Sequence, residues 1–166
     1  MSAAHLIGGA GFVVLLVATQ VGSRARFLAV DFCGLGAVVA HYILLDAPTG
    51  AAMSALYMAI DVTSGLRDRS ELARRGFVAH YGLAVLLVAF TYRGPADLAA
   101  LFGTLAAVAS RQRDEMRPLL LLLVVSSVGW GAYGALVGSV SQVSFSAAYA
   151  TFSLLGVWRL ERQTHA

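Results

Sequence analysis

The sequence predicts an all-α, polytopic membrane protein of seven transmembrane helices, and three observations support this prediction. Of its 166 residues, 58% are hydrophobic and only 13% are charged, whereas about a quarter of a soluble domain is charged. The mean hydropathy of +0.75 is that of an apolar chain. Apolar segments of roughly 16–22 residues recur with short breaks, and a helix needs ~20 residues to cross the hydrocarbon layer. A chain with so little polar surface is expected to lie in a bilayer.

The first four expected helices cover residues 5–22, 27–46, 50–66 and 75–92. The first ends at a basic turn, residues 23–26. Pro48 and Gly50 mark the break between the second and third helices, because these residues favour turns. The start of the chain lacks the basic region of a secretory signal, so we expect the first apolar segment to be a retained helix.

The last three expected helices cover residues 95–110, 117–138 and 140–160. Gly94 with Pro95, and Gly138 with Ser139, supply turn residues before the fifth and seventh helices. Helices are the expected conformation throughout, because a backbone in lipid must pair its own polar groups. Small residues such as Gly34 and Gly129 are expected to let neighbouring helices approach closely.

The twelve basic residues are all arginines, and their positions indicate an orientation. With the N-terminus outside, the inner segments are residues 23–26, 67–75, 111–117 and the tail, and Arg93 alone falls outside. Basic residues favour the cytoplasmic side, so we expect the N-terminus outside and the C-terminus inside. With an even number of helices the arginines would no longer gather on one side of the membrane. The same partition explains the net charge of +3, so we expect no nucleic-acid partner.

An internal repeat appears when the chain is shifted by 92 residues. Gly11 then meets Gly103, and Ser-Ala-Leu-Tyr at 54–57 meets Ser-Ala-Ala-Tyr at 146–149. This register divides the chain into a first three-helix repeat (residues 1–72), a linker helix (73–94) and a second three-helix repeat (95–166). Both repeats would insert in the same direction, as in SWEET transporters, where the two halves are related by an axis along the membrane normal.

Three segments carry a resemblance to a known family: SRARF after the first helix, HYILLDAPTGA between the second and third, and WGAYGALVGS continuing to VWR near the end. With these segments the chain resembles the YgjV-type bacterial inner-membrane proteins, which implies a multi-pass protein of the cell inner membrane. The 3+1+3 plan is also similar to that of the SWEET and PQ-loop transporters. The Pro-Gln pair of those families is missing, and Gly11 and Gly103 could supply flexibility instead.

Some ionisable residues are expected at membrane depth inside the helices, where charges are costly and usually functional. Asp31, Asp61 and His80 are expected toward the inner side, and the functional hypothesis is a proton-linked cluster beside a central cavity. The structural alternative pairs Asp31 with Arg24 or Arg26, and Asp61 with Arg67. We favour the structural alternative for Asp31. For Asp61 we favour function, because its repeat mate is also polar.

A substrate site between the repeats is the second hypothesis. Tyr57 and Tyr149 each lie four residues before a polar residue, so each pair shares one helix face. Aromatic residues with hydroxyl groups suit a small ligand, although packing between helices would use the same residues. The expected substrate-binding residues are Tyr57, Asp61, Tyr149 and Ser153, with Trp130, Tyr133 and His41 toward the outer mouth.

Motifs of enzymes and metal sites are absent from the sequence. GxSxG, HExxH, CxxC and P-loop patterns do not occur, and Cys33 is the single cysteine. We therefore expect no enzyme activity, no cofactor and no metal. The leading hypothesis is a small-molecule transporter that works by alternating access between two three-helix halves, and the alternative is a membrane scaffold or accessory subunit. Lipid and a small-molecule ligand are the expected partners, and the sequence allows a homo-oligomer.

Overall fold

The computed structural model describes residues 3–44, 48–66, 71–136 and 140–164, and in these ranges the chain is all-α. The helices are α1 (Ala3–Ala18), α2 (Arg24–Leu44), α3 (Pro48–Leu66), α4 (Glu71–Thr91), α5 (Pro95–Arg111), α6 (Met116–Leu136) and α7 (Val140–Thr164). The all-α class and the seven predicted helices are confirmed in these ranges, with ends that differ by a few residues.

Local polar contacts explain two of the helix ends. The first helix stops at Ala18, because the Thr19 hydroxyl and backbone N–H both turn back to the carbonyl of Leu16, which satisfies groups that a helix terminus leaves open. The start of α5 is fixed by Pro95 in its first turn and by Asp97, whose carboxylate accepts the backbone N–H groups of Arg93 and Gly94. Proline suits this position because its missing N–H would have no partner there.

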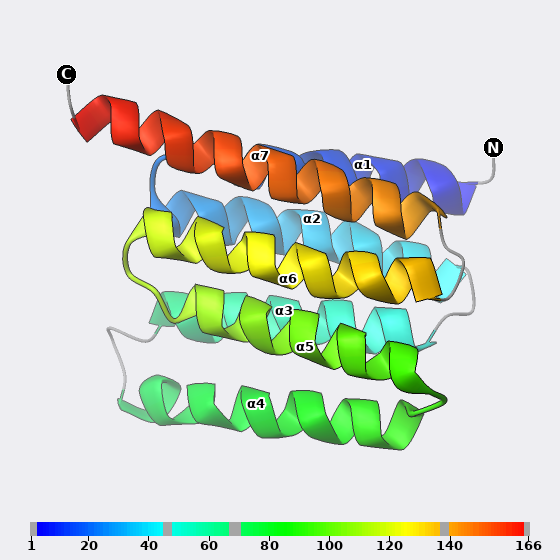
Figure 1. Ribbon diagram of the computed structural model, residues 1–166. Helices are drawn as coiled ribbons and strands as arrows, with labels where there is room; N and C mark the ends of the chain where they lie inside the picture. Colours follow the sequence, from blue (N-terminus) through cyan, green and yellow to red (C-terminus); the bar gives the residue numbers. More distant parts are fainter. Residues whose placement is uncertain (1–2, 45–47, 67–70, 137–139, 165–166) are drawn as a thin grey trace.

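Neighbouring helices in the sequence are neighbours in space, and the chain ends lie at opposite ends of the bundle (Figure 1). Contacts run in series from α1 through α2 to α3, and again from α5 through α6 to α7. The fourth helix packs on α3 and on α5. The two sets of three helices meet directly where α1 packs on α7 and where α3 packs on α5.

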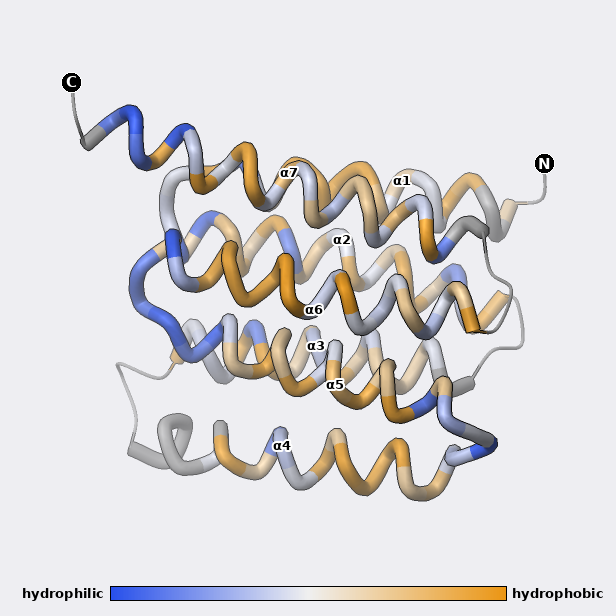
Figure 2. The backbone as a smooth tube through the Cα atoms, viewed as in Figure 1, coloured by the Kyte–Doolittle hydropathy of each residue, from blue (hydrophilic) through white to orange (hydrophobic). Residues whose placement is uncertain are grey.

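The surface of the bundle is strongly apolar. Large hydrophobic side chains lie exposed on many helices, among them Val13, Val78 and Phe90, the last 86% exposed. Two described helices, α2 and α6, are long and apolar enough to cross a membrane, and shorter apolar stretches cover Leu6–Ala18 and Val78–Thr91. Hydrophilic segments gather at the end of the bundle where α7 finishes (Figure 2).

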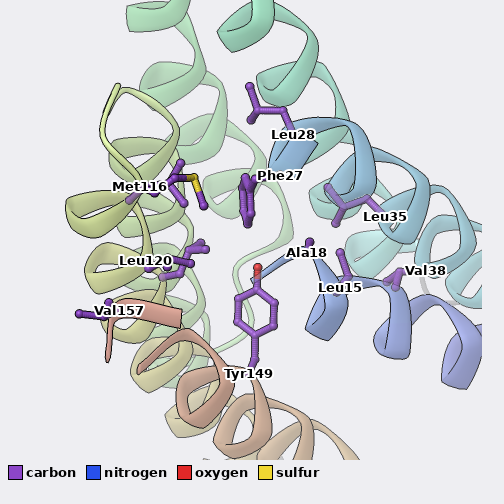
Figure 3. Packing of buried hydrophobic residues seen from close by; sticks show 12 residues of the cluster. Leu15, Ala18, Phe27, Leu28, Leu35, Val38, Met116, Leu120, Tyr149 and Val157 are labelled. Atoms are coloured by element: carbon purple, nitrogen blue, oxygen red, sulfur yellow. The ribbon is translucent and has the colours of Figure 1, made fainter. Parts of the chain in front are cut away.

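Two hydrophobic clusters form the core. The larger one joins α1, α2, α6 and α7, with Leu15, Phe27, Leu120 and Tyr149 among its members (Figure 3). The smaller one joins α3, α4 and α5 around Ile60 and neighbouring side chains. The second cluster holds α4 against the bundle, since it includes residues of that helix.

Glycines allow the closest contacts between helices, as the sequence predicted. A Cβ atom built on Gly129 of α6 would lie 2.6 Å from the Cα atom of Gly103 in α5. A Cβ atom on Gly34 of α2 would lie 3.1 Å from the carbonyl oxygen of Gly11 in α1. Small residues at such crossings let the two backbones touch, which increases the packing attraction between helices in lipid.

Candidate functional site

A cavity lies between the two sets of three helices. It is lined by residues of α1, α2 and α3 and of α5, α6 and α7, and it includes about 710 Å³ of space not filled by protein atoms, open solvent included. Its lining reaches the first turns of α3 and α7 at Gly50 and Gln142, both partly exposed. At the other extreme it is lined by Asp31 and Arg111, both buried.

The buried end of the cavity holds an ion cluster made from three helices. Arg111 at the end of α5 donates from Nε to Asp61 Oδ1 of α3 at 2.8 Å. Its Nη2 donates to Asp31 Oδ2 of α2, and its Nη1 donates to the carbonyl of Ala107 at 3.2 Å. The three charged side chains are at most 3% exposed. Arg111 thereby links the first three-helix set to the second.

Charges in this cluster do not balance. Two carboxylates face one guanidinium, which leaves one surplus negative charge when all three groups are ionised. Asp61 Oδ2 is buried and has no hydrogen-bond partner among the described residues, and Asp31 Oδ1 accepts only a long 3.4 Å bond from the Tyr149 hydroxyl. A buried, under-paired charge is costly, so the cluster is suited to accept a positive group.

Aromatic side chains form two walls of the cavity. On the α1–α7 side, Phe12 stacks on Phe145 with ring centroids 4.1 Å apart, and Phe145 lies 5.5 Å from Tyr149. On the α3–α6 side, Tyr57 and Trp130 meet edge to face at 6.4 Å. The walls therefore come from both three-helix sets.

Tyr57 ties its wall to the ion cluster. Its hydroxyl donates to Thr104 Oγ1 of α5 at 3.1 Å and accepts the indole N–H of Trp130 at 2.8 Å. The guanidinium of Arg111 lies 5.3 Å from the centre of the Tyr57 ring, a cation–π distance. Position and orientation of this ring are thus fixed by α5 and α6.

Polar contacts close the arginine-rich end of the bundle, beyond the ion cluster. Arg24 at the start of α2 donates to the carbonyls of Arg111 and Arg113, at 3.0 and 2.8 Å, and to the carbonyl of Ser64 at 3.0 Å. The Ser64 hydroxyl also donates to the Arg111 carbonyl. Beside them Gln20 donates to the carbonyl of Phe152 in α7 at 2.6 Å. These bonds join the two three-helix sets at this end.

The predicted substrate residues are divided between the cavity and its surroundings. Tyr57, Tyr149 and Trp130 line the cavity. The ring of Tyr133 lies 5.7 Å from that of Trp130, outside the cavity lining. His41 is likewise outside the lining and lies 5.3 Å from the Tyr42 ring.

The predicted polar residues are also divided. Asp31 lines the cavity, and Asp61 lies behind it, bonded to the same arginine. Ser153 is fully buried, and its hydroxyl has no hydrogen-bond partner among the described residues. His80 is buried in α4 and is not part of the cavity lining.

The predicted ion-pair partners need a correction. Asp31 pairs with Arg111 and not with Arg24 or Arg26, because Arg24 is turned toward carbonyl groups at the end of the bundle. Arg67, the partner expected for Asp61, lies outside the described residues, and Asp61 pairs with Arg111.

Arg111 is the residue that the sequence analysis missed, because it was assigned to the inner loop after the fifth helix. Its position directly after an apolar helix did not distinguish it from the other inner arginines. The available signal was the two carboxylates in apolar helices, Asp31 and Asp61, since buried charges are usually paired.

A match to one protein family supports the membrane context. The chain matches the model of a protein family described as Imp-YgjV, bacterial inner membrane protein, over residues 2–164. Neither a curated protein nor a solved structure gives a significant match.

Proposed function

Because the chain belongs to the Imp-YgjV family of bacterial inner membrane proteins, we propose that it carries a small molecule across that membrane by alternating access. The observation that supports this function is the cavity between α1–α3 and α5–α7, with an ion cluster at its buried end. Ligand sites of many transporters lie at such an interface between repeats, near the bilayer midplane.

All seven helices span the membrane in this proposal, with the N-terminus outside. The arginines support the orientation, because Arg24, Arg113, Arg117 and Arg159 belong to the end of the bundle where α7 finishes. Arg93 lies in the turn at the opposite end. Loops rich in arginine face the cytoplasm.

The two-repeat plan is supported by matching glycine contacts. A Cβ atom on Gly11 would lie 3.0 Å from the Gly34 carbonyl oxygen, and one on Gly103 would lie 2.9 Å from the Ser126 carbonyl oxygen. The shift of 92 residues that pairs Gly11 with Gly103 also pairs Gly34 with Ser126. The α1–α2 and α5–α6 crossings therefore occur at the same positions of the two repeats.

A second set of contacts agrees with the same register. Gly50 makes room for the Tyr42 ring, and Gly134 makes room for the side chain of Gln142. The 92-residue shift pairs Tyr42 with Gly134 and Gly50 with Gln142, so the large and small partners are exchanged between the repeats. Helices α2–α3 and α6–α7 thus meet at the same place in both halves.

Alternating access is supported by a difference between the two ends of the interface that joins α1–α3 to α5–α7: one end is closed and the other is partly exposed. The arginine-rich end is closed by the bonds of Arg24, Ser64 and Gln20 to the second half. Toward the other end the cavity lining continues to the partly exposed Gly50 and Gln142. The arrangement corresponds to a carrier whose outer side gives access to the site while its inner side is shut.

Proton linkage belongs to the same proposal and would use the carboxylates of Asp31 and Asp61. The groups that face them are Arg111 from α5 and the Tyr149 hydroxyl from α7. His80 of α4, included in the predicted proton-linked cluster, lies outside the cavity lining. A proton on one carboxylate would neutralise the surplus charge of the cluster.

A scaffold role remains the second candidate, and the polarity of the core distinguishes a scaffold from a transporter. A scaffold needs no polar cavity between its halves, and a solid apolar core would favour it. The buried Asp31 and Arg111 in the cavity lining favour the transporter instead, because ionisable groups at membrane depth are costly without a role.

Thiol labelling without any ligand tests alternating access. In a Cys33→Ser background, Ser54→Cys reports the cavity and Ser153→Cys reports the buried inner part of α7; both serines are buried. Adding Arg24→Ala removes the bonds that hold the arginine-rich end shut. We expect labelling of Ser153→Cys from the inside to rise about tenfold and labelling of Ser54→Cys from the outside to fall, as the access equilibrium shifts.

The matched control is Arg117→Ala. Arg117 lies at the same end and pairs with Glu161, but this pair joins α6 to α7 within the second half. We expect no change at either reporter in this variant. If Arg24→Ala opens the inner side while outer labelling stays constant, the halves do not alternate and the scaffold role is favoured.

A further inference from the structure

We propose that the transported molecule is an organic cation with an apolar, ring-sized body. The inference rests on the proposed transport function and adds the chemical class of the cargo. Two independent features of the cavity support it: the surplus negative charge at the buried end, and the aromatic walls above it.

Arg111 is a poor receptor for an anion, because each of its three nitrogen atoms already donates a hydrogen bond within the protein. Its Nε, Nη1 and Nη2 atoms bond to Asp61, Ala107 and Asp31, respectively. When both carboxylates are ionised against the one guanidinium, the cluster as a whole presents a negative potential to the cavity. In a low-dielectric site, an anionic ligand would be repelled and a cationic ligand attracted.

A buried carboxylate oxygen without a hydrogen-bond partner in the described part of the chain also supports a cationic cargo. Asp61 Oδ2 has no hydrogen-bond partner among the described residues, and Asp31, which lines the cavity, is held on its Oδ1 side only by the 3.4 Å bond from Tyr149. A positive group entering the cavity meets Asp31 first. The cluster therefore lacks one cation for a balanced set of two carboxylates and two positive charges.

Arg24 does not fill this role. It lies at the end of α2, is partly exposed, and its guanidinium donates to carbonyl groups and to the Ser64 hydroxyl. It lies outside the cavity lining. The attraction inside the cavity therefore comes from Asp31 and Asp61.

The walls select an organic cation over an inorganic one. Rings of Phe12, Phe145, Tyr149, Tyr57 and Trp130 surround the space above the cluster. Aromatic faces attract cations that have lost their water, and sets of such rings recognise quaternary ammonium groups. The described residues contain no group of three or more His, Cys, Asp or Glu side chains that could hold a metal ion.

Binding of three matched probes tests the charge of the cargo. The probes are benzyltrimethylammonium, benzyl alcohol and benzoate, which share a ring and differ in charge. Trp130 in the cavity wall provides the signal, and Trp158→Phe removes the only other tryptophan. At constant ionic strength we expect fluorescence titration to give a dissociation constant for the cation about tenfold below those of both other probes.

Variants then locate the charge. We expect Asp61→Asn to raise the dissociation constant of benzyltrimethylammonium about tenfold, and to leave that of benzyl alcohol unchanged. Glu161→Gln removes the same charge from an exposed pair at the bundle end and should change neither constant. If Asp61→Asn does not fold, the comparison of the three probes on the unsubstituted cluster still decides the question.

Equal or tighter binding of benzoate or benzyl alcohol, or no binding of any probe, overturns the cationic cargo. Such a result leaves the transport proposal standing if the thiol reporters still alternate, because that measurement needs no ligand. Cation binding in a protein whose reporters do not alternate keeps the cationic site and rejects transport.

Discussion

Arg111 shows how a single residue connects distant parts of this chain. Its side chain bonds to residues 50 and 80 positions away in the sequence, Asp61 and Asp31. Its carbonyl accepts bonds from Arg24 and Ser64. One residue therefore takes part in both the ion cluster and the closure of the arginine-rich end.

Replacing Arg111 is expected to have a large effect on stability. Arg111→Met leaves two buried carboxylates without a cation, and breaking a buried ion pair in this way costs about 3–5 kcal/mol. We expect a much lower melting temperature in detergent, measured by intrinsic fluorescence or light scattering. The matched control is Arg117→Met, which breaks an exposed pair with Glu161 and should cost about 0–1 kcal/mol.

A triple variant separates charge from packing at this site. Arg111→Met combined with Asp31→Asn and Asp61→Asn removes all three charges at once. Because neutral replacement of a buried ion cluster is often tolerated, we expect the triple variant to melt well above Arg111→Met alone. If both melt at the same low temperature, the arginine acts through its shape and its cation–π contact with Tyr57.

At the scale of helices, the crossing of α5 and α6 is a close contact between two backbones. Gly129 faces the backbone of Gly103, and a Cβ atom there would also lie 2.8 Å from the Ala99 carbonyl oxygen. Backbone atoms cannot move aside as a flexible side chain can. Helices α5 and α6 would have to move apart by a fraction of an ångström to make room for the added Cβ atom. Trp130 lies on the same side of the bundle.

Gly129→Ala is therefore expected to destabilise the bundle. Overpacking of a close contact typically costs about 1–3 kcal/mol, and the loss should appear as a lower melting temperature. Gly82→Ala is the control, because a Cβ atom on Gly82 in α4 meets nothing within 4 Å. Alanine is a better helix former than glycine by about 1 kcal/mol, so the control should melt at the same temperature or higher. A neutral Gly129→Ala would contradict the close crossing.

At the scale of the whole molecule, the seven helices place the two chain ends on opposite sides of the bundle (Figure 1). Labelling of cysteines with a membrane-impermeant reagent in intact cells tests the proposed orientation. In the Cys33→Ser background, Arg93→Cys should label from outside. Glu115→Cys and Gln163→Cys should label only after the membrane is opened. All three native side chains are exposed. Equal labelling of the three positions in intact cells would contradict the seven-span topology.

The fold class and the helices were predictable because each depends on short stretches of sequence. Apolar length indicates a helix in lipid, and Pro95 or Pro48 beside glycine indicates a break. The packing role of Gly34 and Gly129 was predictable for a related reason, since small residues are characteristic of close helix crossings. Helix ends were less exact, as at Ala18, where the Thr19 hydroxyl ends α1 earlier than the apolar pattern does.

The candidate site was only partly predictable. Tyr57, Tyr149 and Trp130, three of the expected substrate-binding residues, line the cavity between the two sets of three helices. Arg111 was not separated from the arginines that set the orientation. A charge after an apolar helix has the same local pattern whether it faces the cytoplasm or turns back to pair with a carboxylate.

The sequence by itself determined the secondary structure, the membrane context and the family, because hydrophobic length and loop charge act segment by segment. The tertiary structure alone decided which charges meet: Asp31, Asp61 and Arg111 come from three helices and are adjacent only after packing. The surplus charge of that cluster, and the cavity above it, exist because the free energy of a buried charge depends on all its neighbours at once.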